Sequence, residues 1–185
     1  MVKYVKLYFL KGLGFFMKSK KLLLFWVFLS VFALFSAGCS SDAIRIYEPG
    51  DASDLSRNEN GKIIPGEGLV CIALHGKDGA LILDETLVYV DYKKEVSVAD
   101  LSRDICREKN IPIAFAGMGS MSYFSGIGNV FEFDDGPESG WIYSVNGEYQ
   151  GVGCGSYILK EREYVEWHYS LDLGRDLGAY FLDDE

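Results

Sequence analysis

Hydrophobic and polar positions alternate most clearly near the end of the chain, in residues 164–170. The two sides of this segment carry Val165, Trp167 and Tyr169 on one side and Tyr164, Glu166 and His168 on the other. Such a period of two predicts a strand with one apolar face. The segment Trp141–Gln150 alternates in the same way around Asn146-Gly147, a pair that tolerates positive φ and therefore predicts a hairpin with a type I′ turn.

Further strand segments and a helix are predicted between residues 69 and 109. The continuous apolar run 69–76 is typical of a buried strand, and a turn at 77–79 separates it from strand segments at 80–83 and 87–91. Ser97 followed three residues later by Asp100 resembles a capping box, so a helix is expected from Val98 to Lys109.

The remaining segments complete the predicted domain. Residues 113–117 predict a short strand after Pro112, and residues 117–128 follow neither period, so we expect an ordered loop there. We find no internal repeat. Strands, one helix and more strands predict an α+β fold, a mixed sheet with one main helix on one face.

The first 38 residues differ from the rest in charge. They hold six of the 18 basic residues and none of the 27 acidic ones. The uncharged stretch Leu22–Gly38 follows a lysine cluster and ends in small residues before Cys39, which predicts a signal peptide, with a transmembrane anchor as the alternative. Translation starting at Met17 would keep the lysine cluster, and a genuinely long leader remains the other possibility.

The string Ser36-Ala37-Gly38-Cys39 resembles the bacterial lipoprotein box. This resemblance implies lipidation of Cys39, cleavage before it, and a mature protein anchored outside the cytoplasm to the cell membrane. We therefore expect a signal peptide at 1–38, a flexible polar tether at 39–67, the domain at 68–180 and an acidic tail at 181–185.

Beyond residue 38 the chain has 12 basic and 27 acidic residues, a net charge of −15. Nucleic acid is excluded as a partner, because affinity for it comes mainly from Lys and Arg. The sequence contains no recognisable pair of a catalytic nucleophile and its general base. His75 and His168 are expected to be surface side chains without zinc-ligand spacing, and we predict no metal site, no cofactor and no enzymatic activity.

Residues 69–180 resemble the bacterial transcobalamin-like C-terminal domain family, a β-grasp module of largely unknown function. Four short strings together carry the resemblance: Ser139-Gly140-Trp141, Ser144-Val145-Asn146-Gly147, Gly155-Ser156-Tyr157 and Val165-Glu166-Trp167. The resemblance implies capture of a ligand rather than catalysis, since in animal cobalamin carriers this domain covers one face of the corrin ring. A corrinoid or another ring-bearing small molecule is therefore the candidate ligand.

We expect the ligand to bind where the loop 123–129 meets the hairpin 141–151. Large apolar side chains on a loop are either packed in the core or held for a partner, and both possibilities remain open. The candidate ligand-binding residues are Tyr123, Phe124, Ile127, Asn129, Trp141 and Tyr149. The alternative function is a cell-surface interaction module that docks a transporter subunit or another envelope protein.

With Cys39 lipidated, three cysteines remain. Cys71 lies in the first predicted strand and Cys106 lies beside the apolar stripe of the predicted helix, so a helix packed on that sheet would bring them together. We predict a Cys71–Cys106 disulfide and a free thiol at Cys154. The alternative is three reduced, buried cysteines that behave as small apolar residues.

Overall fold

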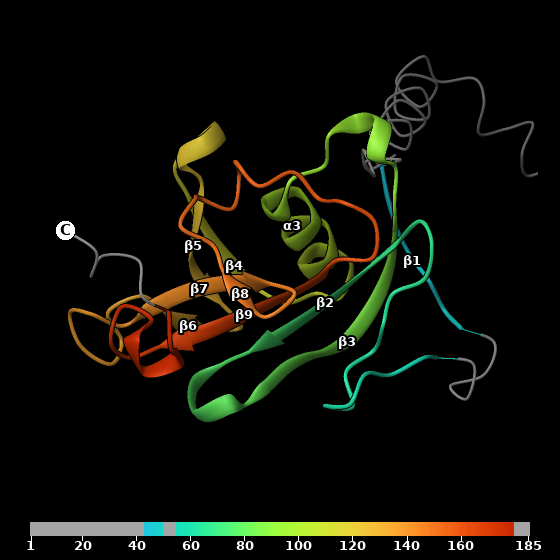
Figure 1. Cartoon of the computed structure of the whole chain (residues 1–185). Helices are drawn as coiled ribbons and strands as arrows, with labels where there is room; N and C mark the ends of the chain where they lie inside the picture. The colour runs from blue at the N-terminus through green and yellow to red at the C-terminus, as the bar shows by residue number, and fades with distance from the viewer. Residues whose placement is uncertain (1–42, 50–54, 180–185) are drawn as a thin grey trace, which may run out of the picture. The chain divides into compact units, whose positions relative to one another are not determined.

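The computed structural model describes residues 43–49 and 55–179, which all belong to one compact unit (Figure 1). The predicted signal peptide, Cys39 and the acidic tail lie outside the described residues. Within the described residues, no helix has the length and apolar character needed to cross a membrane.

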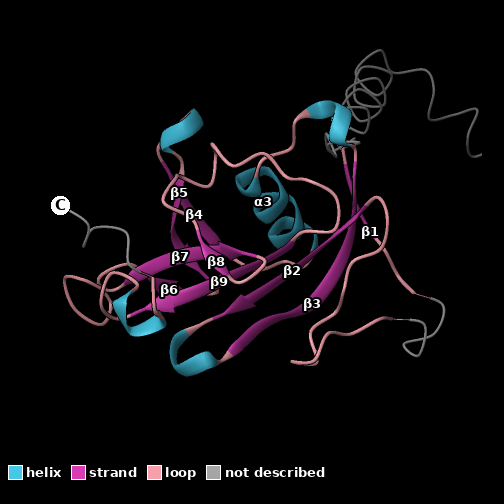
Figure 2. Ribbon diagram, in the orientation of Figure 1, coloured by secondary structure: helices cyan, strands magenta, loops and turns pink. Residues whose placement is uncertain are grey.

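The main sheet has six strands and is mixed. In spatial order they are β1 (Ile44–Ile46), β3 (Leu81–Val90), β2 (Leu69–His75), β9 (Tyr164–Ser170), β7 (Gly140–Val145) and β8 (Glu148–Tyr149). The central pair β2 and β9 is parallel, and every other pair is antiparallel. With one α-helix packed on this sheet, the predicted α+β class is confirmed (Figure 2).

A smaller antiparallel sheet contains β4 (Ile113–Ala116), β5 (Tyr123–Ile127) and β6 (Val130–Phe131). The prediction of a loop at 117–128 is therefore wrong for β5. Its sequence hides the strand because Gly126 interrupts the apolar pattern. A side chain at Gly126 would meet the Phe131 ring, with its Cβ 2.6 Å from a ring carbon, so packing between neighbouring strands requires the glycine.

The helix α3 (Val98–Glu108) begins as the sequence predicts. The Ser97 hydroxyl accepts a hydrogen bond from the Asp100 backbone N–H at 3.1 Å, and the Asp100 carboxylate accepts one from the Ser97 N–H at 3.2 Å. This reciprocal pair satisfies two backbone donors that a helix start leaves free. The helix then presents a buried stripe to the main sheet.

The core lies between α3, the main sheet and the small sheet. Trp167 is at its centre, 2% exposed, and its indole N–H donates to the Ser102 hydroxyl at 2.8 Å. The Ser102 hydroxyl in turn donates to the Val98 carbonyl at 2.7 Å. The Phe124 ring packs edge-on against Trp167, with centroids 5.0 Å apart.

The opposite face of the main sheet is covered by residues 55–65, which we call the strap. Ile63 of the strap is buried in a second apolar cluster with Leu69, Cys71, Leu87 and Tyr164. The structure thus differs from the expected tether in its described parts, residues 43–49 and 55–67. Strand β1 pairs with β3, and the strap is held on the sheet. The composition of this segment is polar because its few apolar side chains alternate with residues that remain in water.

Candidate functional site

The six predicted ligand-binding residues do not form one site. Phe124 and Ile127 are 1% and 0% exposed and belong to the core, so they cannot contact a ligand there. Asn129 occupies the turn between β5 and β6 with φ of 67°. Its exposed position reflects this turn, which requires a residue that tolerates the left-handed conformation.

Trp141 and Tyr149 lie on opposite faces of the main sheet. The Trp141 indole N–H donates to the Val130 carbonyl at 2.9 Å, and its ring packs against Tyr169 on the face that carries α3. The Tyr149 ring contacts His168 on the strap face, with centroids 5.9 Å apart. The hairpin therefore does not direct both aromatic side chains toward the loop.

Tyr123 is the one predicted aromatic residue that is both exposed and next to other exposed apolar side chains. It starts β5, directly after a short 3-10 turn (Gly119–Met121) at the end of the β4–β5 hairpin. Met118 and Met121 are 86% and 81% exposed, and Tyr123 is 45% exposed. We call these three residues the methionine tip.

The segment 151–157 braces the methionine tip. Gly153 and Gly155 run so close to the turn that a Cβ at either position would lie 2.5 Å from the Ser120 carbonyl oxygen or 2.1 Å from that of Gly119. The Cys154 thiol donates to the Ser122 carbonyl at 3.1 Å. These contacts hold the backbone of the tip while its side chains stay in solvent.

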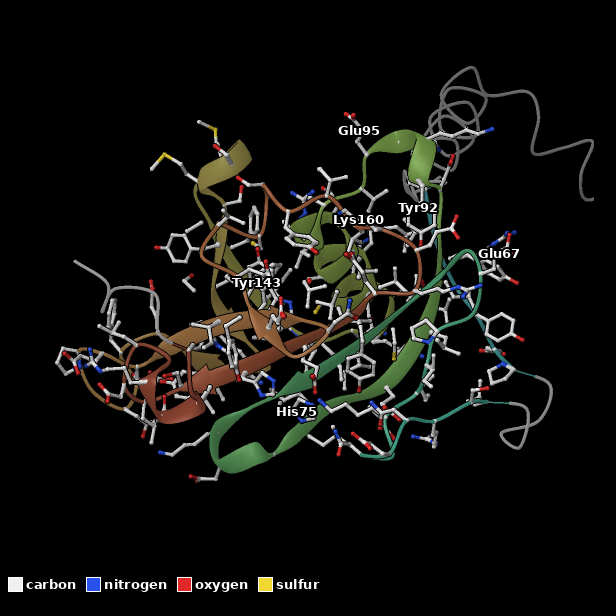
Figure 3. The ribbon with its side chains drawn as sticks, viewed as in Figure 1. Glu67, His75, Tyr92, Glu95, Tyr143 and Lys160 are labelled. Atoms are coloured by element: carbon white, nitrogen blue, oxygen red, sulfur yellow. The ribbon has the colours of Figure 1, made fainter. Side chains whose placement is uncertain are left out.

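Tyr143 and Val152 extend this bracing to the main sheet. The Tyr143 hydroxyl donates to the Val152 carbonyl at 2.8 Å, and Tyr143 projects from β7 toward this segment (Figure 3). Val152 itself is 50% exposed. Sequence reasoning overlooked Met118 and Val152. One signal in the sequence could have identified both residues. Each lies between two glycines, at Gly117–Gly119 and Gly151–Gly153, and an apolar residue in such a segment is not expected to be buried by a regular helix or strand.

A second candidate region is the polar cluster on the strap face. Glu166 follows Val165 and precedes Trp167 on β9, so its side chain points to the strap face. The strap covers it there, and only 5% of the side chain is exposed. The Lys62 ammonium lies 2.5 Å from one carboxylate oxygen, and His75 Nε2 lies 3.6 Å from the other. Burial alone would raise the pKa of Glu166, but these two partners outweigh it and lower the pKa to about 2.

The sequence predicted that His75 and His168 are surface side chains, but the structure places both of them half-buried and in contact with each other. They occupy paired positions on the parallel strands β2 and β9, and their rings stack with centroids 5.0 Å apart and an interplanar angle of 11° (His75 is labelled in Figure 3). Burial lowers the pKa of His168, against the opposing effect of Glu166. The described residues contain no group of three or more His, Cys, Asp or Glu side chains arranged to hold a metal ion.

Glu85 fixes the strap at a second point. Its carboxylate accepts hydrogen bonds from the Arg57 guanidinium at 2.5 Å, the Ile63 backbone N–H at 2.8 Å and the Tyr164 hydroxyl at 2.9 Å. Burial would raise the pKa of Glu85, and these donors lower it below its usual value. The strap is thus attached through two carboxylates that lie on the sheet.

A cavity of about 260 Å³ opens beside this attachment, between the strap, the Asn146-Gly147 turn and the start of β9. Both turn residues have positive φ, 53° and 84°, as the sequence predicted. Lys62, Arg162 and Glu166 are the charged side chains that line the cavity. No sequence pattern pointed to this cavity, because its walls come together only when the strap docks.

The predicted Cys71–Cys106 disulfide is not supported. Both residues and Cys154 are free, buried thiols. Cys106 faces the helix-side core, whereas Cys71 points to the strap side, since Val70 and Ile72 are the β2 residues that face the helix. Burial raises the pKa of the thiols to about 12 for Cys71 and Cys106, so both stay protonated at neutral pH.

A known sequence family described as a domain of unknown function (DUF4430) matches residues 97–170. The match spans the helix and the later strands, which carry much of the transcobalamin-like resemblance. No curated protein has a sequence significantly similar to this chain.

Two solved structures match part of this chain at low structural similarity. One is a putative metal binding protein from Ruminococcus gnavus ATCC 29149, with a TM-score of 0.41, 10% identity, and coverage of 56% of this chain and 97% of that chain. The other is haptocorrin in complex with Cbi, with a TM-score of 0.40, 13% identity, and coverage of 57% of this chain. The matched region spans only 26% of the haptocorrin chain.

Proposed function

We propose that the domain is a non-catalytic ligand-binding module whose contact surface is the methionine tip. The observation that carries the proposal is the exposure of Met118 and Met121, at 86% and 81%, on a hairpin that is fixed in the core by Phe124, the residue directly after the tip. Flexible apolar side chains held on a rigid backbone are typical of binding surfaces. The neighbouring Val152 extends the apolar surface.

The first ligand to test is a corrinoid, and a second is any other ring-bearing small molecule. This choice rests on the sequence resemblance to transcobalamin-like domains and on the chemistry of the tip. Thioethers and a tyrosine ring suit contact with a flat conjugated system. The single aromatic contact, that of Tyr123, contributes roughly 0.5–1.5 kcal/mol beyond burial. Micromolar affinity corresponds to about 8 kcal/mol, so we expect micromolar or weaker binding, most of it from burial of apolar surface.

We also infer a β-grasp-like fold for residues 68–180. The strand order β3-β2-β9-β7 supports this inference, because the antiparallel pairs β2–β3 and β7–β9 are joined through the parallel pair β2 and β9, with α3 between the two antiparallel pairs in sequence. This arrangement leaves the methionine tip as an addition to the sheet rather than one of its strands.

A binding role without catalysis agrees with the state of the thiols. Cys154, the thiol nearest the methionine tip, is 2% exposed, and burial raises its pKa to about 11. A protonated, buried thiol is a poor nucleophile. We therefore assign Cys154 the structural role of bracing the Ser122 carbonyl.

We propose further that lipidation of Cys39 anchors the protein outside the cytoplasm. The lysine cluster, the apolar stretch and the Ser36-Ala37-Gly38-Cys39 string support this proposal. The expected mature chain begins at Cys39 and partitions into detergent. Intact-mass analysis of membrane-extracted protein tests it, and an unmodified Cys39 within a longer chain would contradict it.

Docking of an envelope protein is the second candidate function of the methionine tip. Unbranched methionine side chains adapt to irregular protein surfaces as readily as to small ligands. The two functions differ in what stabilises the domain. A small ligand alone stabilises the domain by RT ln(1 + [L]/Kd), so the melting temperature rises with the logarithm of its concentration above Kd, whereas a partner protein is needed in the second case.

A spectroscopic titration tests ligand binding directly. We expect a visible-absorbance shift of cobinamide or cyanocobalamin on adding the detergent-purified chain, and loss of that shift in the double variant Met118→Ser/Met121→Ser. The control is Leu81→Ser, which removes a leucine that is 56% exposed on β3. An equal loss in the control, or a shift that persists in the double variant, would contradict the assignment of the tip.

A further inference from the structure

The cavity between the strap and the Asn146-Gly147 turn is separate from the methionine tip and has an unusual charge for this acidic chain. Its lining carries two cations, Lys62 and Arg162, and one carboxylate, Glu166. Lys62 and Glu166 form an ion pair at 2.5 Å, so their charges offset one another. One positive charge, that of Arg162, is left for a ligand.

The backbone of Arg162 is held by a hydrogen bond, whereas its guanidinium group is available to a ligand. Its backbone N–H donates to the Leu69 carbonyl at 2.8 Å, and its φ is 66°. Among the contacts of residues 43–49 and 55–179, the Arg162 guanidinium has no hydrogen-bond or ion-pair partner. A guanidinium presents a planar fork of N–H donors that matches a carboxylate.

Two asparagines in the lining have their amide orientation set by the backbone. The Asn146 side-chain oxygen accepts from the Tyr164 N–H at 2.9 Å, and the Asn58 side-chain oxygen accepts from the Lys62 N–H at 3.0 Å. With both oxygens engaged, the NH₂ groups are the ends that remain for a ligand, and an NH₂ group only donates. The lining is therefore rich in free donors, whereas its one carboxylate is occupied.

We propose that this cavity binds the carboxylate of a small organic acid or of a peptide C-terminus. The Arg162 fork pairs with the two carboxylate oxygens, and the Asn146 NH₂ group donates to one of them. Ile63 and the Tyr164 ring supply an apolar wall for the carbon chain. A volume of about 260 Å³ is below the ~300–1000 Å³ usual for drug-sized ligands, which limits the occupant to a small acid or a single terminal residue.

The charge of the lining favours a carboxylate over a phosphate. A carboxylate carries one negative charge, which the single unpaired cation matches. A phosphate dianion would need Lys62 to leave Glu166, and Glu166 would then be a buried charge without its closest partner.

The test uses NMR to compare the binding of an acid and of its uncharged amide to the full chain in detergent. N-acetylalanine is expected to shift the backbone amide signals of Gly147 and Arg162, and N-acetylalanine amide, which lacks the negative charge, is expected to shift them at least tenfold less at equal concentration. A peptide ending in a free alanine distinguishes the two sources. Binding at least tenfold tighter than N-acetylalanine identifies a chain terminus, and similar binding identifies a small acid.

Two variants and a control locate the site. Asn146→Asp keeps the oxygen that accepts from Tyr164 and the positive-φ turn, but replaces the NH₂ donor with a negatively charged oxygen. We expect it, like Arg162→Gln, to raise the Kd for N-acetylalanine at least tenfold. The control Arg107→Gln makes the same charge change on α3, where the Arg107 side chain is 60% exposed, and is expected to leave the Kd unchanged.

The proposal is overturned if the amide binds as well as the acid, if inorganic phosphate binds more tightly than N-acetylalanine, or if the well-folded Asn146→Asp variant binds normally. The comparison of acid with amide needs no variant, so it decides the question even if a substitution prevents folding.

Discussion

The two faces of the main sheet are closed by different interactions. On one face α3 packs through Val98, Leu101 and Ile105 against a core that contains Trp167. On the other face the strap is attached through the carboxylates of Glu85 and Glu166 as well as through the buried side chain of Ile63. The same strands supply both faces, because successive side chains of a strand point in opposite directions.

Because of this difference, we expect the stability of the two sides of the domain to depend differently on pH. Burial of apolar surface does not depend on pH, so the helix side should persist wherever the sheet persists. Attachment through carboxylates depends on their ionisation, so the strap side should weaken in acid. The strap forms one wall of the candidate carboxylate cavity, which would be lost with it, whereas the methionine tip lies beyond the helix-side core.

The largest effect is expected for Trp167→Ala on the helix side. It removes the centre of the core and leaves the Ser102 hydroxyl without its indole partner. We expect a loss of about 3–5 kcal/mol in the free energy of unfolding, measured by urea denaturation. Leu81→Ala, at an exposed position, should change it by less than about 0.5 kcal/mol. A small loss for Trp167→Ala would show that the helix side is not the main source of stability.

The next effect is the pH dependence of Glu166. Its pKa is about 2 in the folded chain against 4.5 ordinarily, so its contribution is fully present above pH 4.5 and is lost as the pH falls toward 2. We expect Glu166→Gln to be less stable than the wild type by about 3 kcal/mol at pH 7, with the difference vanishing near pH 2.

Urea denaturation at a series of pH values measures this difference. Glu95→Gln, at an exposed position labelled in Figure 3, is the control and should keep the wild-type pH profile. If Glu166→Gln retains the same acid-dependent loss as the wild type, the strap is not held through this carboxylate.

A smaller loss in the free energy of unfolding is expected for Arg57→Gln. This variant tests whether an exposed ion pair on the strap side contributes less to stability than a buried one. Arg57 is 49% exposed in its ion pair with Glu85, so solvent and salt screen the pair. We expect a loss of at most about 1 kcal/mol that shrinks further in 1 M NaCl. A loss as large as that of Glu166→Gln would mean that exposed and buried pairs contribute equally.

The smallest effect is expected for a reducing agent. The strap side of the sheet buries one thiol, Cys71, the helix side buries two, Cys106 and Cys154, and all three are free. The melting temperature should therefore stay within about 1 °C on adding dithiothreitol. Peptide mapping without reduction checks the same point, and a joined pair of cysteine peptides would contradict the placement of Cys71.

Local sequence signals were sufficient to predict those elements that depend on neighbouring residues. The capping box of Ser97 and Asp100 marks the start of α3, the pair Asn146-Gly147 marks the turn, and the alternation of residues 164–170 marks β9. Each of these signals depends on residues within a few positions of one another. The α+β class follows from the order of such elements.

Contacts between side chains from distant segments could be seen only in the folded domain. The parallel pairing of β2 with β9 brings His75 beside His168, and the docking of the strap buries Glu166 and forms the cavity. The sequence pattern indicates that a strand has two faces but not which face receives the helix, and for that reason the pairing of Cys71 with Cys106 was wrong. Contacts between distant segments depend on the free energy of the whole packed domain, which no local pattern records.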